Sequence, residues 1–302
     1  RLAKGGHKVV MYDAWPHAGG LLKYGIPSFK LNKPSVTRKF DDLAAMGIEV
    51  VPDTYVGRDI ELDTLASQFD AVFLAFGAPQ DSTLGIANED APGVHRATEF
   101  LVRGNVATED LPESLREPLP HAKHVVVVGG GDTSMDCVRT AIRLGSDVVT
   151  LIYRRTEAEM QGRTEERKHA REEGVQFEFL TAPVEIVLND QGAVAALRCR
   201  RMHLGEPDES GRARPEPVPG SEFDVPADII ITAIGYNTDP VWGEAAPEVK
   251  RDQWGRVLVD PETMRTAQKG VFAGGDNVNG ADLVVTALAD GQRAAAAIDA
   301  YL

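Results

Sequence analysis

The chain has 302 residues, of which 43% are hydrophobic and 26% charged, and this is typical of a globular protein with two domains of ordinary size. Its formal net charge of −14 argues against nucleic acid and anionic membrane surfaces as partners. The apolar runs are too short to span a membrane, and Cys137 and Cys199 form neither a disulfide framework nor a CxxC motif. A reducing cytoplasm therefore fits, and no metal site is predicted.

The first 80 residues are expected to alternate strands and helices. A buried strand is predicted over 9–13, ending in Asp13, and a glycine-rich loop follows over 18–27. The next elements are predicted in the order helix 34–46, strand 48–51, helix 60–68 and strand 71–77. In a dinucleotide-binding unit, an acid about 20 residues after the glycines binds a ribose. Only twelve residues precede Asp13, so the first strand and glycine loop of such a unit would lie before residue 1; the alternative is that Asp13 merely ends a strand.

A glycine motif stands at the centre of the chain. Residues 78–122 mix proline, glycine and charge, and we expect them to cross between two domains, with one short helix over 97–104. The four valines at 125–128 then run directly into three glycines, and a helical pattern follows over 133–144. A run without polar alternation predicts a parallel strand buried on both faces.

The three glycines fit the GxGxxG dinucleotide fingerprint, with Ser134 in the place of the third small residue. Phosphates would rest at the positive end of the helix that starts near Asp132. A second strand is predicted over 148–153, and Arg154 and Arg155 follow it, where an NAD site would carry an acid. An acid would repel a 2′-phosphate, whereas a guanidinium can bind one, so we expect NADP(H). The alternative is a solvated arginine pair that closes a strand.

The second half of the chain continues the alternation. A charged, solvated helix is expected over 165–173 and a central strand over 229–235, which ends in glycine as 71–77 does. This similarity indicates two domains of like construction. The other predicted elements are strands at 175–180, 193–202, 223–225 and 270–276, a loop at 205–220 and a helix at 283–300.

Several runs resemble the small (β) subunit of glutamate synthase, within the flavoproteins that have two dinucleotide-binding domains. These runs are 19–31, 56–59, 129–139, 153–155, 170–175, 272–276 and 282–287. The resemblance implies an α/β fold of two Rossmann-like, doubly wound, three-layer domains with a small antiparallel β piece. The FAD-binding domain would comprise 1–118 and 239–302, lacking its first strand and glycine loop, and the NADP(H)-binding domain, 119–238, would be inserted in it.

The motif and the resemblance together predict the cofactor-binding residues. For NADP(H) they are Gly129, Gly130, Gly131, Asp132, Thr133, Ser134, Arg154, Arg155 and Gly235. For FAD they are Asp13, Gly19, Gly20, Leu21, Gly25, Ile26, Gly77, Gly275, Asp276, Val285 and Thr286. The resemblance implies that Asp13 holds the adenosine ribose, that Asp276 holds the ribityl–pyrophosphate region, and that amides near Val285 face the flavin N1/C2=O edge. We name no catalytic acid or base, because hydride transfer needs alignment and a dry site.

The resemblance implies that NADPH delivers a hydride to flavin N5 and that electrons leave through iron–sulfur clusters to a partner, the large subunit of glutamate synthase. Any cluster would come from another chain or from sequence outside this one. The family often has Met-Pro at 160–161 and basic residues at 164–165, where this chain has Met-Gln and Thr-Glu. Two alternatives are an NADPH:acceptor reductase, similar to dihydropyrimidine dehydrogenase or NADPH–ferredoxin oxidoreductase, and a binding module without turnover that holds FAD weakly or not at all.

Overall fold

The computed structural model describes residues 1–207, 211–239 and 246–302, and its contacts divide the chain into two compact units. Unit 1 comprises Arg1–Lys23, Asn32–Gln80 and Tyr236–Leu302, and unit 2 comprises Tyr24–Leu31 and Asp81–Gly235. The chain therefore enters unit 2 twice. The sequence places residues 24–31 and 81–118 in the FAD-binding domain, whereas the contacts group them with unit 2.

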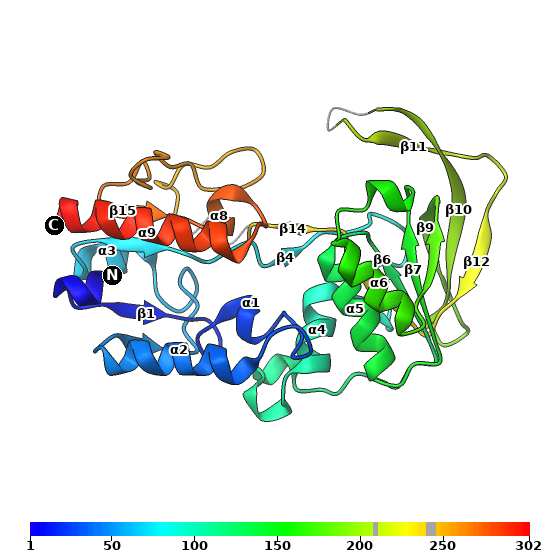
Figure 1. The fold of residues 1–302 in the computed structure, drawn as a ribbon, viewed down its shortest axis with the longest axis horizontal. Helices are drawn as coiled ribbons and strands as arrows, with labels where there is room; N and C mark the ends of the chain where they lie inside the picture. Colours follow the sequence, from blue (N-terminus) through cyan, green and yellow to red (C-terminus); the bar gives the residue numbers. More distant parts are fainter. Residues whose placement is uncertain (208–210, 240–245) are drawn as a thin grey trace. The chain divides into compact units, whose positions relative to one another are not determined.

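A five-stranded parallel sheet forms the centre of unit 2 (Figure 1). Its strands, in spatial order, are β5 (Val94–Arg96), β13 (Ile229–Thr232), β6 (His124–Val128), β7 (Val148–Tyr153) and β8 (Gln176–Phe179). From β6 the chain winds outward to β7 and β8 on one side, while β13 and β5 lie on the other side. The valines of β6 are buried on both faces, as their unbroken apolar run predicts.

Helices cover one face of this sheet and a small antiparallel sheet covers the other. The helices are α4 (Ala97–Asn105), α5 (Asp132–Arg143) and α6 (Thr164–Glu172), and they share a core with Val125 and Val127 of β6. The antiparallel strands are β9 (Thr181–Leu188), β10 (Val194–Pro207), β11 (Ala213–Pro217) and β12 (Phe223–Pro226). Of these strands, β9, β10 and β12 pack on Val126 and Val128. Alternate valines of one strand thus build two cores, and unit 2 has three layers.

Unit 1 contains two pairs of parallel strands with helices around them. The pairs are β1 (Val10–Tyr12) with β2 (Glu49–Val51), and β3 (Val72–Leu74) with β15 (Val271–Ala273). The helices are α1 (Gly20–Lys23), α2 (Lys33–Ala45), α3 (Leu62–Gln68), α8 (Asp276–Asn279) and α9 (Val284–Tyr301). A core of Leu62, Leu74, Val271 and Ala273 joins β3, β15 and α3. Shorter pieces of the chain are η1 (Leu2–Gly5), β4 (Gln80–Asp81), η2 (Thr108–Asp110), η3 (Glu113–Leu115), η4 (Glu157–Glu159) and β14 (Tyr236–Asn237).

The structure confirms the predicted fold class and corrects several elements. The loop predicted over 18–27 contains α1, the crossing predicted over 78–122 contains β5, and the loop predicted over 205–220 contains β11. β9 was not predicted at all. α1 and β5 have only four and three residues, and local patterns miss elements this short. β9 and β11 both pair with the neighbouring β10, but each contains proline, which argues against a strand when the sequence alone is read. β1 is only half-buried, not buried as predicted. Within the described ranges, no helix combines the length and hydrophobicity that crossing a membrane requires.

Candidate functional site

The three glycines lie where β6 ends, at the point where the sheet of unit 2 changes winding direction. A Cβ built on Gly129 would lie 2.2 Å from the carbonyl oxygen of Ala233, which follows β13. A Cβ on Gly130 would lie 2.4 Å from the ring of Tyr153. Only glycine therefore fits at either position. In parallel α/β sheets, ligands bind at the carboxyl ends of the strands beside such a switch point.

The third glycine faces open space at the start of α5. Gly131 is the N-cap residue of this helix, and a Cβ built on it meets no atom within 4 Å. Since glycine has no side chain, the first-turn amides of α5 have no cap from this residue. The hydroxyl of the buried Ser134 donates to the Gly131 carbonyl at 2.6 Å and holds the turn in place. The start of α5 thus has the geometry of an anion site, with Asp132 and Thr133 in its first turn.

A second loop lies against the glycines and brings a cation to them. The Gly162 amide donates to the Gly130 carbonyl at 2.9 Å, and a Cβ on Gly162 would lie 3.2 Å from the Gly131 carbonyl carbon. The backbone amide and Nε of Arg163 donate to the two Asp132 carboxylate oxygens at 2.8 and 2.9 Å. Sequence reasoning missed Arg163. Its only signal is its place between the two departures from the family pattern, at 161 and 164–165.

The two arginines that follow β7 lie in different environments. Arg154 is exposed, whereas Arg155 is buried to 3% exposure and its Nε donates to the Ala213 carbonyl at 2.8 Å. Arg155 therefore attaches the end of β7 to β11. Gly235, the last predicted NADP(H) residue, follows β13 with φ of +116° and is exposed, at the carboxyl ends of the strands as Gly129 is. Arg154 and Arg163 are thus the exposed cations of the predicted site.

Asp13 and two of the predicted FAD glycines lie together in unit 1. Asp13 directly follows β1, and its Oδ1 accepts the Trp15 amide at 3.0 Å. Burial raises the pKa of Asp13, while the amides of Trp15 and Gly19 oppose this shift. Gly19 packs tightly, because a Cβ there would lie 3.0 Å from the Lys23 Cβ. Gly20 begins α1 with φ of +48° and faces open space.

A second cluster of predicted FAD residues surrounds the turn after β15. Gly275 has φ of +81° and its amide donates to Asp290 Oδ2 at 2.8 Å. Asn279 donates to the same oxygen at 2.7 Å. Asp276 begins α8, and burial raises its pKa, while a hydrogen bond from the Asp282 backbone amide opposes this shift. Sequence reasoning missed Asp290, a fully buried carboxylate on α9 that holds this turn.

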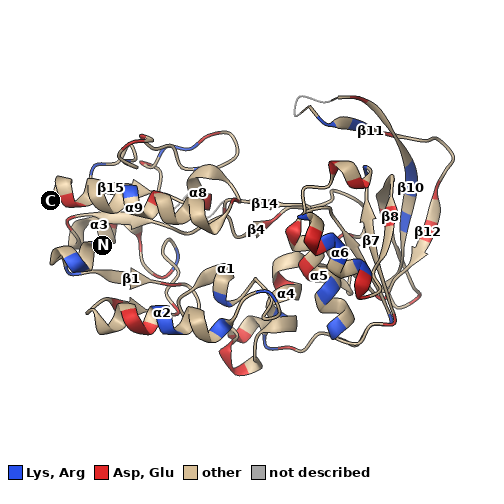
Figure 2. Ribbon diagram, in the orientation of Figure 1, with Lys and Arg blue, Asp and Glu red and all other residues tan. Residues whose placement is uncertain are grey.

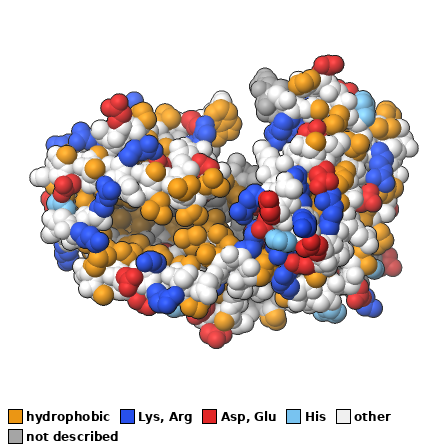
Figure 3. All heavy atoms as spheres, viewed as in Figure 1, with side chains coloured by type: hydrophobic (Ala, Val, Ile, Leu, Met, Phe, Trp, Pro, Cys, Tyr) orange, Lys and Arg blue, Asp and Glu red, His pale blue; other side chains and the backbone are white. Residues whose placement is uncertain are grey.

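The start of α9 presents apolar side chains to solvent. The exposed residues are Leu283, Val284, Val285 and Leu288, and Leu21 after Gly20 is exposed as well. The predicted FAD residues Val285 and Thr286 lie in the first turn of this helix. On the visible face of unit 1, hydrophobic side chains gather around a hollow (Figure 3). Such an exposed apolar surface is typical of a ligand or partner site.

The remaining predicted FAD residues are not grouped with these two clusters. Gly77 follows β3 in unit 1 with φ of +72° and faces open space. Gly25 and Ile26 belong to the segment Tyr24–Leu31, which the contacts group with unit 2, and Gly25 is buried. Across the described ranges, no group of three histidine, cysteine or acidic side chains is placed to hold a metal ion.

Comparison with known proteins shows which family the chain belongs to. Residues 1–291 match the family described as "Pyridine nucleotide-disulphide oxidoreductase". All of the chain aligns with the putative oxidoreductase AegA of Escherichia coli at 47% identity, and with the glutamate synthase (NADPH) small chain of the same organism at 45% identity. It spans 46% and 65% of the length of these two proteins.

A third relative is better covered. The chain aligns in full with 73% of a putative glutamate synthase (NADPH) small chain of Cereibacter sphaeroides, at 40% identity. Among solved structures, Mycobacterium tuberculosis FprA in complex with NADPH superposes with a TM-score of 0.80 over 97% of this chain and 77% of that one. At 19% identity, this likeness concerns the fold alone. The chain therefore belongs to the pyridine nucleotide-disulphide oxidoreductase family, among the relatives of the glutamate synthase small chain.

Proposed function

We propose that unit 2 binds NADP(H) at the carboxyl ends of β6 and β13. The observation that carries this proposal is the glycine loop. Gly129 packs against the backbone of Ala233 and Gly130 against the ring of Tyr153, while Gly131 leaves open space in front of the first turn of α5. A pyrophosphate binds at a helix N-terminus where no side chain fills the space in front of the backbone amides. The residues present therefore fit the coenzyme.

The cations around the loop support the phosphorylated coenzyme over its unphosphorylated form. Arg154 is exposed at the end of β7, where the ribose of a bound dinucleotide lies in this fold. We assign the 2′-phosphate to Arg154. Arg163, held by Asp132 beside the glycine loop, is a second candidate for a phosphate contact. We assign Arg155 a supporting role instead, because its guanidinium is buried and donates to Ala213.

We propose that unit 1 binds FAD. Gly20 and Gly77 both face open space. Asp13 directly follows β1, Asp276 begins α8 after the turn that follows β15, and both are partly buried, which suits binding to sugar hydroxyls. The exposed first turn of α9 would direct its amides at the electron-rich edge of the ring system, and its apolar side chains would exclude water from it. When bound, FAD accepts a hydride from NADPH and passes the electrons on.

We infer that the chain provides the electron input of a larger NADPH-dependent oxidoreductase, as in glutamate synthase, where an iron–sulfur partner accepts the electrons for L-glutamate synthesis. The identity with two glutamate synthase small chains supports this inference. An anaerobic absorbance titration tests it: FAD is added to the purified chain, followed by NADPH. Bleaching of the flavin band at one equivalent of NADPH is the expected result, and an unchanged band with FAD bound would refute the proposal.

Two other functions are candidates, and a different measurement separates each of them from the proposed one. The 47% identity with a putative oxidoreductase supports an NADPH:acceptor reductase, and capture of a large amidotransferase-type subunit by the tagged chain would favour glutamate synthase over it. A binding module without turnover would bind NADPH and leave added flavin oxidised. The sequence-based prediction of weak FAD binding stays a prediction, and stoichiometric flavin absorbance in the purified chain would refute it.

A further inference from the structure

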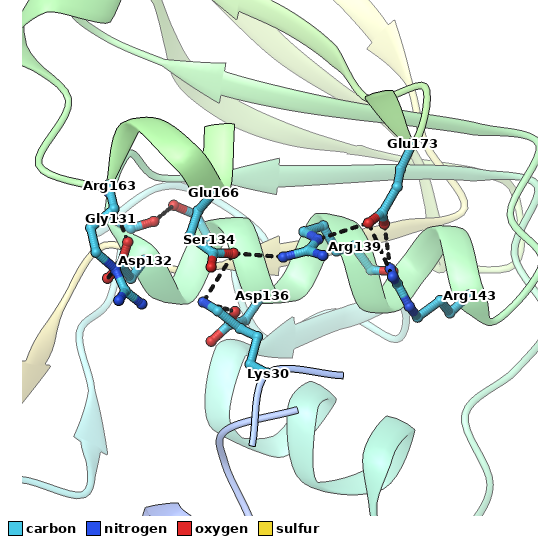
Figure 4. Close-up of polar contacts among 10 residues, drawn as sticks. All are labelled: Lys30, Gly131, Asp132, Ser134, Asp136, Arg139, Arg143, Arg163, Glu166 and Glu173. Atoms are coloured by element: carbon cyan, nitrogen blue, oxygen red, sulfur yellow. Dashed lines mark hydrogen bonds and ion pairs between the residues drawn. The ribbon is translucent and has the colours of Figure 1, made fainter. Parts of the chain in front are cut away.

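A buried network of ion pairs joins three segments of unit 2 (Figure 4). Lys30 Nζ lies 2.5 Å from Asp136 Oδ1 on α5 and 3.2 Å from Glu166 Oε2 on α6. Each of these three side chains is only 11–13% exposed. Lysine, aspartate and glutamate are rarely buried to this degree unless they are paired. Lys30 is thus the cation that two buried carboxylates share.

The network continues through two arginines of α5, which pair with carboxylates on and next to α6. Arg139 donates to Glu166 at 2.6 Å and to Glu173 at 3.0 Å, and Arg143 binds Glu173 with both terminal nitrogens. Three cations therefore face three carboxylates, and Lys30 supplies one of the three positive charges. Figure 2 shows this mixture of charges on α5 and α6. Loss of Lys30 would leave the buried carboxylates of Asp136 and Glu166 with one cation fewer, and removing one partner of a buried ion pair strongly lowers the free energy of unfolding.

Phe29, which precedes Lys30, contacts the same arginines of α5 through cation–π interactions. The guanidinium carbons of Arg139 and Arg143 lie 4.6 and 4.0 Å from the ring centroid of Phe29. Tyr24, at the other end of the segment Tyr24–Leu31, is buried to 1% exposure. The segment is continuous at both ends with unit 1, yet Phe29 and Lys30 attach it to α5 and α6 of unit 2.

We propose that Lys30 is a positioning residue, which fastens the segment Tyr24–Leu31 to α5 and α6 and thereby fixes the positions of Gly25 and Ile26, two of the residues that the sequence assigns to FAD. This inference rests on the proposed function for its consequence in catalysis, but not for the fastening itself. Burial raises the pKa of Asp136 to about 6, and Lys30 opposes that shift, which is consistent with a close pair. The ion pairs of Lys30 are with Asp136 and Glu166 and not with Arg154 or Arg163, so coenzyme affinity should not depend on it.

Hydrogen exchange in the full chain tests the fastening. In Lys30→Met, amides in the peptide that covers 24–31 should exchange at least tenfold faster than in the wild type. Lys30→Arg keeps a cation that can bridge both carboxylates and should restore the rate to within about threefold. Lys39→Met, which removes a lysine that is 81% exposed on α2, is the matched control and should leave the rate unchanged. If Lys30→Met does not fold, Asp136→Asn, which leaves Lys30 with Glu166 alone, provides the comparison.

Kinetics with added FAD then test the consequence. Lys30→Met should bind NADPH within threefold of the wild-type Kd but reduce flavin at least tenfold more slowly, and Lys30→Arg should recover most of the rate. Wild-type exchange of 24–31 in Lys30→Met would overturn the fastening, and wild-type flavin reduction in that variant would overturn its role in catalysis. If the wild-type chain binds no NADPH, the proposed function fails, and the exchange comparison still decides whether Lys30 fastens the segment.

Discussion

Replacing Gly131 by alanine separates a phosphate-binding role from a structural one. Gly131 has φ of −96° and ψ of −178°, a conformation that any residue adopts, and a Cβ on it meets no atom within 4 Å. The fold should therefore tolerate the methyl group, and the free energy of unfolding should fall by less than about 1 kcal/mol, the scale of N-cap effects. The same methyl group would occupy the space through which a pyrophosphate approaches the first turn of α5.

The expected loss of coenzyme binding follows from that geometry. Moving a phosphate away from the first-turn amides weakens at least one charge-assisted hydrogen bond, which contributes about 1.5–3 kcal/mol. The Kd for NADPH should therefore rise at least about tenfold, equivalent to about 1.4 kcal/mol. Calorimetry measures the binding, and urea unfolding measures the stability.

Gly291→Ala is the matched control for this experiment. Gly291 lies on α9 in unit 1, and a Cβ built on it also meets no atom within 4 Å. That variant should bind NADPH as the wild type does. If Gly131→Ala folds and binds NADPH with unchanged affinity, the loop is a structural turn and the assignment of the pyrophosphate to it is wrong.

Four further substitutions test individual residues. Arg154→Gln should weaken NADPH binding about ten- to hundredfold by calorimetry and leave NADH binding unchanged, because only NADPH carries the 2′-phosphate; an equal loss for both coenzymes would count against that contact. Arg155→Gln should instead lower the free energy of unfolding by about 1–3 kcal/mol, since Ala213 loses its donor, and unchanged stability in urea would contradict this. Asp290→Ala should destabilise unit 1 by a similar amount, about 1–3 kcal/mol, and weaken FAD binding, because it removes the acceptor of the Gly275 amide; full flavin retention would oppose the assignment. Burial raises the pKa of Asp136 from 3.8 to about 6, so the folded state holds this proton more tightly. Relative to Asp136→Asn, the wild type should therefore lose about 3 kcal/mol of stability as the pH rises from about 3 to about 7, and a difference independent of pH would refute the assignment.

The part of the site nearest the glycines could be predicted from sequence because its signals are local. Four valines, three glycines and an amphipathic helical pattern follow one another within 20 residues, and β6, α5 and β7 begin and end within about one residue of their predicted bounds. Each element is specified by its own residues: the strand by an unbroken apolar run, the turn by glycine and the helix by its periodicity.

The parts that could not be predicted depend on partners distant in sequence. Val94–Arg96 is three residues long and contains a histidine, and only its pairing with β13 makes it a strand. Arg155 has the same local pattern as Arg154, and its burial depends on a carbonyl 58 residues away. The role of Lys30 depends on a carboxylate 106 residues away. For the same reason, the sequence predicts that the charged helix α6 is solvated, whereas its Glu166 belongs to the buried network of ion pairs.

Calorimetry of the purified chain with NADPH and with NADH tests the central claim most directly. The exposed guanidinium of Arg154 beside an open glycine loop predicts that NADPH binds about ten- to hundredfold more tightly than NADH, the difference that one charge-assisted phosphate contact contributes. Equal affinities, a preference for NADH, or binding of neither coenzyme would contradict the account.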